Sequence, residues 1–200
     1  MASDFTPRQI EIIHAALALI AESGIQGMTI KNLARRIGFS ESAVYRHYEN
    51  KVGILLAILE YFDQNFEQLF ASVLQSDTSV PEKLEALFMN LFGIFQATPS
   101  LVSVIFSEEF FRNEDILYKK VSGVMNQNLR QLTNFLAQGQ ANGEIRQDVQ
   151  AKLLATIILG SVRLQVKQWQ IMGYTTDIVA QGKELINTLK ILLNTSSAKT

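Results

Sequence analysis

One segment, residues 29–51, constrains the fold of this chain more than any other. Its sequence is TIKNLARRIGFSESAVYRHYENK. Its first half repeats apolar residues at helical spacing, namely Leu33, Ala34 and Ile37. Gly38 can then take the left-handed backbone that a sharp turn needs. Ser40 is a good helix N-cap, after which Val44 and Tyr48 restart an apolar face at a spacing of four. The segment therefore predicts two short helices joined by a tight turn, the pattern of a helix-turn-helix.

The side chains outside this apolar face are cationic or hydrogen-bonding, and such groups contact phosphates and base edges. The segment holds five Lys or Arg residues against two Glu, although the net charge of the whole chain is −1. Positive charge is thus concentrated in a small module, which favours a protein that touches DNA with one surface. The structural alternative is a helical hairpin whose charges are only solvated.

Composition and periodicity predict an all-α fold. Apolar residues make up 48% of the 200 residues, only three are proline, and the apolar positions recur every three or four residues. We expect nine helices, near residues 7–27, 29–37, 41–47, 51–74, 81–96, 99–111, 113–142, 147–172 and 176–194. They divide into a three-helix DNA-binding domain at residues 1–50 and a helical ligand-binding and dimerisation domain at 51–195. Residues 196–200 are expected to be a disordered tail.

Several function classes lack support in the sequence. There is no cysteine, so disulfides and thiolate chemistry are excluded. Neither histidine, His14 nor His47, is accompanied by a carboxylate cluster, so we expect no metal and no other cofactor. An all-α enzyme is an alternative without a recognisable catalytic arrangement. No signal peptide or stretch of membrane-spanning length is visible, so we expect a cytoplasmic protein with no membrane partner.

The N-terminal quarter resembles the TetR family of bacterial transcriptional regulators. The resemblance is carried by Thr29-Ile30, Leu33-Ala34, Ile37-Gly38, Ser40, Val44-Tyr45, His47-Tyr48 and Asn50-Lys51. It implies the family's nine-helix architecture and a transcriptional regulator, most commonly a repressor. A DNA-binding protein that needs no ligand is the closest alternative.

The resemblance also implies roles for individual residues. The helix beginning at Glu41 would enter the major groove, and the base-reading residues would be Glu41, Ser42, Ala43 and Arg46. Phosphate contacts would come from Thr29, Tyr45, His47 and Lys51, and the surface would also include Arg36 and Ser40. Lys51 opposes the dipole of the helix that it begins, a conflict that a bound phosphate would remove. A dimer with recognition helices about 34 Å apart would bind a palindromic operator of double-stranded DNA.

The remaining 150 residues would dimerise the protein and sense a small molecule. In the family the last two helices pair with those of a second copy, which assigns dimerisation to Ala151, Leu154, Ala155, Ile158, Val162, Ile178, Leu185 and Leu189. Nine of the twelve phenylalanines lie between residues 62 and 111 and could surround an apolar or aromatic effector that releases the DNA. The candidate ligand-binding residues are Phe62, Phe66, Phe88, Phe92, Phe95, Phe110 and Trp169. Packing inside one protomer is the alternative for both sets.

Overall fold

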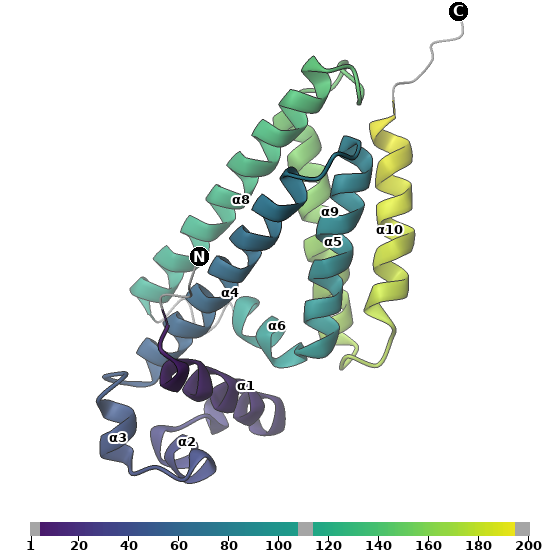
Figure 1. The fold of residues 1–200 in the computed structure, drawn as a ribbon. Coiled ribbons are helices and arrows are strands. Elements are labelled where there is room, and N and C mark those ends of the chain that lie inside the picture. The colour runs from purple at the N-terminus through teal and green to yellow at the C-terminus, as the bar shows by residue number, and fades with distance from the viewer. Residues whose placement is uncertain (1–4, 108–113, 195–200) are drawn as a thin grey trace, which may run out of the picture. The chain divides into compact units, whose positions relative to one another are not determined.

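The computed structural model describes residues 5–107 and 114–194, and within these ranges the chain forms nine helices and no strand (Figure 1). The helices are α1 (Pro7–Gly27), α2 (Ile30–Ile37), α3 (Glu41–Tyr45), α4 (Lys51–Leu74), α5 (Val80–Ala97), α6 (Pro99–Ile105), α8 (Asp115–Ala141), α9 (Ala151–Ile171) and α10 (Ile178–Leu193). The predicted all-α class is confirmed. Phe110, Asn113 and the predicted tail lie outside the described residues.

Side-chain caps begin α1, α2, α3 and α4 where the sequence places a capping residue. The capping residues are Thr6, Thr29, Ser40 and Asn50. Their side-chain oxygens accept main-chain N–H bonds from Gln9, Asn32, Ala43 and Gly53 at 3.3, 3.1, 3.2 and 3.0 Å. Each cap of this kind stabilises its helix by about 1 kcal/mol. Gly38 ends α2 with φ 70°, the left-handed conformation that the turn requires.

The connection between α8 and α9 departs from the prediction. α9 begins at Ala151, whereas the apolar periodicity placed its start at Gln147. The amide Nε2 of Gln140 donates to the main-chain oxygens of Arg146 and Val149, both at 2.7 Å. These bonds hold the segment before Ala151 as a turn. The prediction missed this turn because it rested on the spacing of apolar residues, which says nothing about polar contacts.

The described chain divides into two compact units. The first comprises residues 1–67 and 98–122, and the second comprises residues 68–97 and 123–200. α4 and α8 therefore each contribute to both units. The domain boundary expected at residue 50 differs from this division, because Ile54, Leu55 and Ile58 of α4 are fully buried and the helix adds its apolar face to the first unit.

In the first unit α1 contacts α2 and α6, and α2 contacts α3. α1 is long and apolar enough, by length and composition alone, to cross a membrane. Its Ile12, Ile13 and Ala16 are buried, so core packing explains this apolar character. An ion pair joins the start of α8 to α4 within the same unit, with 3.0 Å between Lys120 Nζ and Asp63 Oδ2.

In the second unit α10 lies alongside α5 and α9 (Figure 1). The approach of α10 to α5 depends on Gly182, where an added Cβ would lie 2.3 Å from Cδ2 of Phe92. An ion pair at the same contact places Lys190 Nζ 2.6 Å from Glu85 Oε2. A glycine inside a helix is intrinsically unfavourable, so its presence here reflects the close packing of the Phe92 ring.

Candidate functional site

The surface around α3 is built on one buried residue. Val44 is fully buried, and Tyr48, four residues later, is buried as well. The side chains exposed around this anchor are Ser40, Glu41, Ser42, Tyr45, Arg46 and His47, whereas Ala43 is half-buried. α3 ends at Tyr45 rather than at the predicted His47, but the His47 N–H still donates to the Val44 oxygen at 2.9 Å. The predicted polar face of α3 is thus presented together, outward from the core of the first unit.

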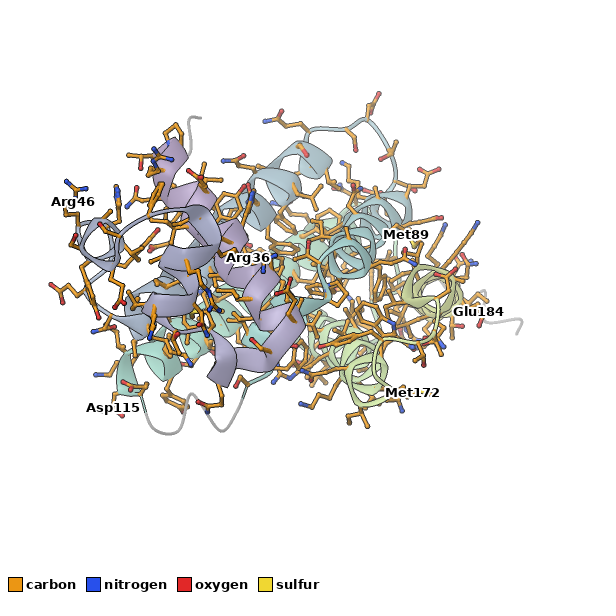
Figure 2. All side chains as sticks on the ribbon, turned by 90° about the horizontal axis from the view of Figure 1, so that it is seen from below. Arg36, Arg46, Met89, Asp115, Met172 and Glu184 are labelled. Carbon is orange, nitrogen blue, oxygen red and sulfur yellow. The ribbon has the colours of Figure 1, made fainter. Side chains whose placement is uncertain are left out.

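The cations near α3 differ in how they are held. Arg46 projects away from the ribbon at the end of α3 (Figure 2). Arg36, by contrast, places Nη1 2.7 Å from Glu22 Oε2. Their hydrogen bond raises the pKa of the Arg36 guanidinium and lowers that of the Glu22 carboxyl. The charge of Arg36 is therefore partly compensated by Glu22, which weakens the attraction of the guanidinium for a phosphate.

Lys51 makes a contact that the sequence did not suggest. Its Nζ donates a short hydrogen bond to the main-chain oxygen of Ile25. Ile25 follows a break in α1 at Gly24, where φ is 68°. Burial lowers the pKa of the Lys51 amine. The Lys51 side chain thus links the start of α4 to the end of α1 through a hydrogen bond. Its contact with a phosphate stays a prediction.

Arg8 is a residue of this surface that sequence reasoning did not assign. Its Cζ lies 4.4 Å from the ring centroid of Phe39, in the turn between α2 and α3, and its Nη1 lies 2.6 Å from Glu11 Oε2. A guanidinium over an aromatic face is attracted by the ring quadrupole. The spacing of three residues predicts the pair with Glu11. The stacking on Phe39 cannot be predicted from spacing, because only the fold brings these two residues together.

Tyr48 carries a polar group into the core of the first unit. Its hydroxyl is shielded from solvent and has no hydrogen-bond partner among the described residues. Burial raises the pKa of this phenol to about 12. The sequence identified Tyr48 as an apolar position, and the ring satisfies that role while the hydroxyl does not.

The predicted ligand-binding residues fall into both units. Phe62 and Phe66 belong to the first unit, with ring centroids 6.3 Å apart. Phe88, Phe92, Phe95 and Trp169 belong to the second unit, where all four are buried. The Trp169 indole N–H donates to the Thr176 main-chain oxygen at 2.8 Å. Phe92 packs on Gly182, so at this position the structure favours core packing.

The predicted dimerisation residues also have a place in the protomer's own core. The buried members are Leu154, Ala155, Ile158, Val162, Ile178 and Leu189, whereas Ala151 and Leu185 are half-buried. The opposite side of α9 is apolar too, and there Leu153, Ile157 and Leu164 expose 54%, 50% and 59% of their surfaces. The predicted dimerisation residues therefore pack largely within the protomer, and their role in a dimer stays a prediction.

Comparison with known proteins matches both parts of the chain. Residues 12–58 match the model for bacterial regulatory proteins of the tetR family, and residues 62–193 match the model for the C-terminal region of YsiA-like proteins. The fatty acid metabolism regulator protein of Bacillus subtilis (strain 168) is 22% identical over 183 residues, which cover 92% of this chain and 94% of that protein.

Solved structures show the same fold. The fatty acid degradation regulator FadR from Bacillus halodurans superposes with a TM-score of 0.82 at 22% identity, covering 98% of this chain and 99% of that one. FadR from Bacillus subtilis, solved in complex with stearoyl-CoA, gives a TM-score of 0.77 at 23% identity, with coverages of 90% and 96%.

These matches bear on the predictions made from residues 29–51. The predicted function, a ligand-responsive DNA-binding transcriptional regulator of the repressor type, is confirmed at the level of the family. The relative from Bacillus subtilis and the matched tetR model are both described as regulators. With its N-terminal and C-terminal parts both matched by models for such regulators, the chain belongs to the tetR family of bacterial regulatory proteins.

Proposed function

We propose that the protein is a cytoplasmic, homodimeric repressor that binds a palindromic operator through α3 and leaves it when an acyl-CoA binds. The observation that carries the DNA-binding half is the polar face of α3. Glu41, Ser42 and Arg46 are exposed around a fully buried Val44, so the core holds the helix while its outer face stays available. Side chains placed in this way can enter a major groove, where each base pair has a distinct pattern of donors and acceptors.

The dimer is supported by the outer face of α9. Leu153, Ile157 and Leu164 form an apolar row that continues past Gly160, where an added Cβ would meet no atom within 4 Å. On α10, Ile191 and Leu192 expose 75% and 50% of their surfaces. Contiguous exposed apolar surface of this kind marks an interaction site. Because a two-fold axis pairs the same patch on both copies, this apolar row would lie against its own counterpart in the dimer.

The effector class is supported by the aromatic side chains and by the relatives. Phe88 and Phe95 are buried in the second unit of a chain whose C-terminal region matches that of YsiA-like proteins. One relative is named a fatty acid metabolism regulator, and a structural neighbour is described in complex with stearoyl-CoA. A long acyl chain is an apolar ligand suited to aromatic surroundings. We therefore propose a long-chain acyl-CoA as the effector of this chain.

The test is a selection from a randomised pool of double-stranded DNA, followed by titration of the selected site with stearoyl-CoA. We expect a palindrome to be recovered, and stearoyl-CoA to weaken its binding by about 5–150-fold, the range of ordinary allosteric coupling. Free coenzyme A is the matched control, because it lacks only the acyl chain. Recovery of no preferred sequence would contradict the DNA-binding proposal, and a selected site indifferent to stearoyl-CoA would leave a regulator that does not respond to this effector.

A further inference from the structure

The buried face of α8 in the second unit contains a polar group among apolar ones. Leu132, Phe135 and Leu136 are buried and follow Asn128 by four, seven and eight residues, so they share its side of the helix. Phe135 meets Phe70 of α4 edge to face, with ring centroids 6.3 Å apart. An amide in such surroundings is expected to be hydrogen-bonded, because burial removes it from water.

Asn128 does not meet this expectation within the described chain. Its Oδ1 is shielded from solvent and accepts no hydrogen bond from any described residue. Thr133 of the same helix avoids the problem, since its hydroxyl donates to the Leu129 oxygen at 2.7 Å. Asn134, one residue further along, is exposed to solvent. An unpaired buried group of this kind calls for an explanation beyond the packing of the protomer.

From this geometry we infer that Asn128 is a ligand-binding residue, whose amide hydrogen-bonds the uncharged thioester carbonyl of a bound acyl-CoA. The inference rests on the proposed effector and adds the group that the protein recognises. An amide is neutral, and a half-turn of its terminal torsion exchanges the oxygen acceptor for the NH₂ donor at the same place. Asn128 can thereby donate to a carbonyl oxygen without bringing a charge into the apolar face of α8.

The choice of an amide also predicts selectivity. A thioester carbonyl is uncharged and can enter an apolar region with a single hydrogen bond, whereas a free carboxylate carries a charge that burial strongly disfavours. A site built around a neutral hydrogen bond rejects a ligand that lacks the partner group, because the protein group is then left unpaired. Asn128 would thus separate the activated acyl group from the free fatty acid.

The test pairs two ligands with two variants. Stearoyl-CoA is compared with S-octadecyl-CoA, a thioether that lacks only the carbonyl oxygen, by calorimetric titration of the full-length protein. We expect the wild type to bind the thioester about tenfold more tightly. In Asn128→Leu this preference should fall to about onefold, and in the control Asn134→Leu, on the exposed side of α8, it should be retained. Asn128→Ala provides a second variant with a smaller side chain.

Thermal unfolding of the ligand-free proteins gives an independent readout. We expect the Tm of Asn128→Leu to equal or exceed that of the wild type, because the substitution removes an unpaired group. A lower Tm would mean that the amide serves the fold, and would overturn the inference. Equal binding of both ligands by the wild type, or equal effects of the two leucine variants, would overturn it while leaving the acyl-CoA effector in place. Failure of both ligands to bind would overturn the proposed effector and, with it, the role of Asn128.

Discussion

The ammonium group of Lys51, at the start of α4, donates to the main-chain oxygen of Ile25, just beyond the break in α1 at Gly24. Two segments on either side of the helix-turn-helix are thereby joined by one side chain. The contact gives a structural reason for a cation in the first turn of a helix, where the dipole disfavours it. It also means that a substitution of Lys51 changes the protein as well as any contact with DNA.

Lys51→Met is expected to lower both stability and DNA affinity. Loss of the bond to Ile25 should lower the free energy of unfolding by about 1 kcal/mol, a value reduced for the partial exposure of the amine. If Lys51 also contacts a phosphate, the slope of log K against log salt concentration should fall by about one. Denaturant unfolding and anisotropy titrations at several salt concentrations measure the two effects separately. Lys31→Met, an exposed cation of α2, is the control and should leave stability unchanged.

Arg46→Ala is expected to change sequence preference with little effect on stability. Arg46 is exposed and projects from the first unit, so its removal should alter the free energy of unfolding by less than about 0.5 kcal/mol. Loss of a base contact should cost about 1–3 kcal/mol at one base pair of each half-site. Competition with operators that differ at single base pairs measures this. A uniform loss across all operators would assign Arg46 to the phosphate backbone instead.

Tyr48→Phe is expected to stabilise the protein, and most strongly at high pH. At neutral pH the removal of an unpaired buried hydroxyl should add about 1 kcal/mol to the free energy of unfolding. Burial raises the pKa of the phenol from 10.0 to about 12, so the folded state favours the protonated form. That contribution is present below pH 10 and is lost as pH rises towards 12, a loss of at most about 3 kcal/mol.

Unfolding followed between pH 7 and 12 tests the role of Tyr48. The wild type should lose stability over the alkaline part of this range, and Tyr48→Phe should lose less. Tyr45→Phe is the matched control, since Tyr45 is exposed and its hydroxyl can remain in water. Identical alkaline profiles for wild type and Tyr48→Phe would show that the hydroxyl of Tyr48 is not buried as described.

Gly182→Ala is expected to destabilise the second unit. The added methyl group would lie 2.3 Å from the Phe92 ring, so α5 and α10 would have to separate, at a cost of about 1–3 kcal/mol. Gly123→Ala in α8 is the control: its Cβ meets no atom within 4 Å, and alanine is the better helix former by about 1 kcal/mol. Denaturant unfolding should therefore move in opposite directions for the two variants, and a gain in stability for Gly182→Ala would contradict the close packing.

Leu164→Glu is expected to convert the proposed dimer to monomers. Leu164 is 59% exposed on the outer face of α9, so a carboxylate there leaves the protomer's own core intact. In a two-fold interface the substitution brings two unpaired charges into the same apolar contact. Sedimentation measures the state of association, and Met125→Glu, another exposed apolar position on α8, is the control. Equal sedimentation of both variants as dimers would place the interface elsewhere.

The residues that set local structure were predictable, because their effects act within a few positions. Thr29, Ser40 and Gly38 each act on the main chain nearby, and the structure has each of them in the expected role. Arg8 on Phe39 and Lys51 on Ile25 join residues that only the fold brings together, so no spacing rule identifies them. The same limit explains why the buried, unpaired Oδ1 of Asn128 was not predicted.

The choice between the two faces of α9 shows a different limit. Leu154 and Ile158 point into the protomer, whereas Leu153 and Ile157, one position earlier, are exposed. Both rows are apolar at helical spacing, so periodicity alone fits either one. What separates them is the presence of α10 on one side, which is a property of the tertiary structure. A helix that is apolar on two faces therefore needs a structure before its interface can be assigned.

α3 comprises only five residues, from Glu41 to Tyr45. Isolated helices shorter than about 12–15 residues are marginal in water, so a synthetic peptide of this sequence would be unstructured. The order of its exposed side chains is supplied by the Ser40 cap and by the burial of Val44. Transfer of the DNA specificity proposed for α3 to another regulator would therefore require exchange of the whole three-helix module rather than of α3 alone.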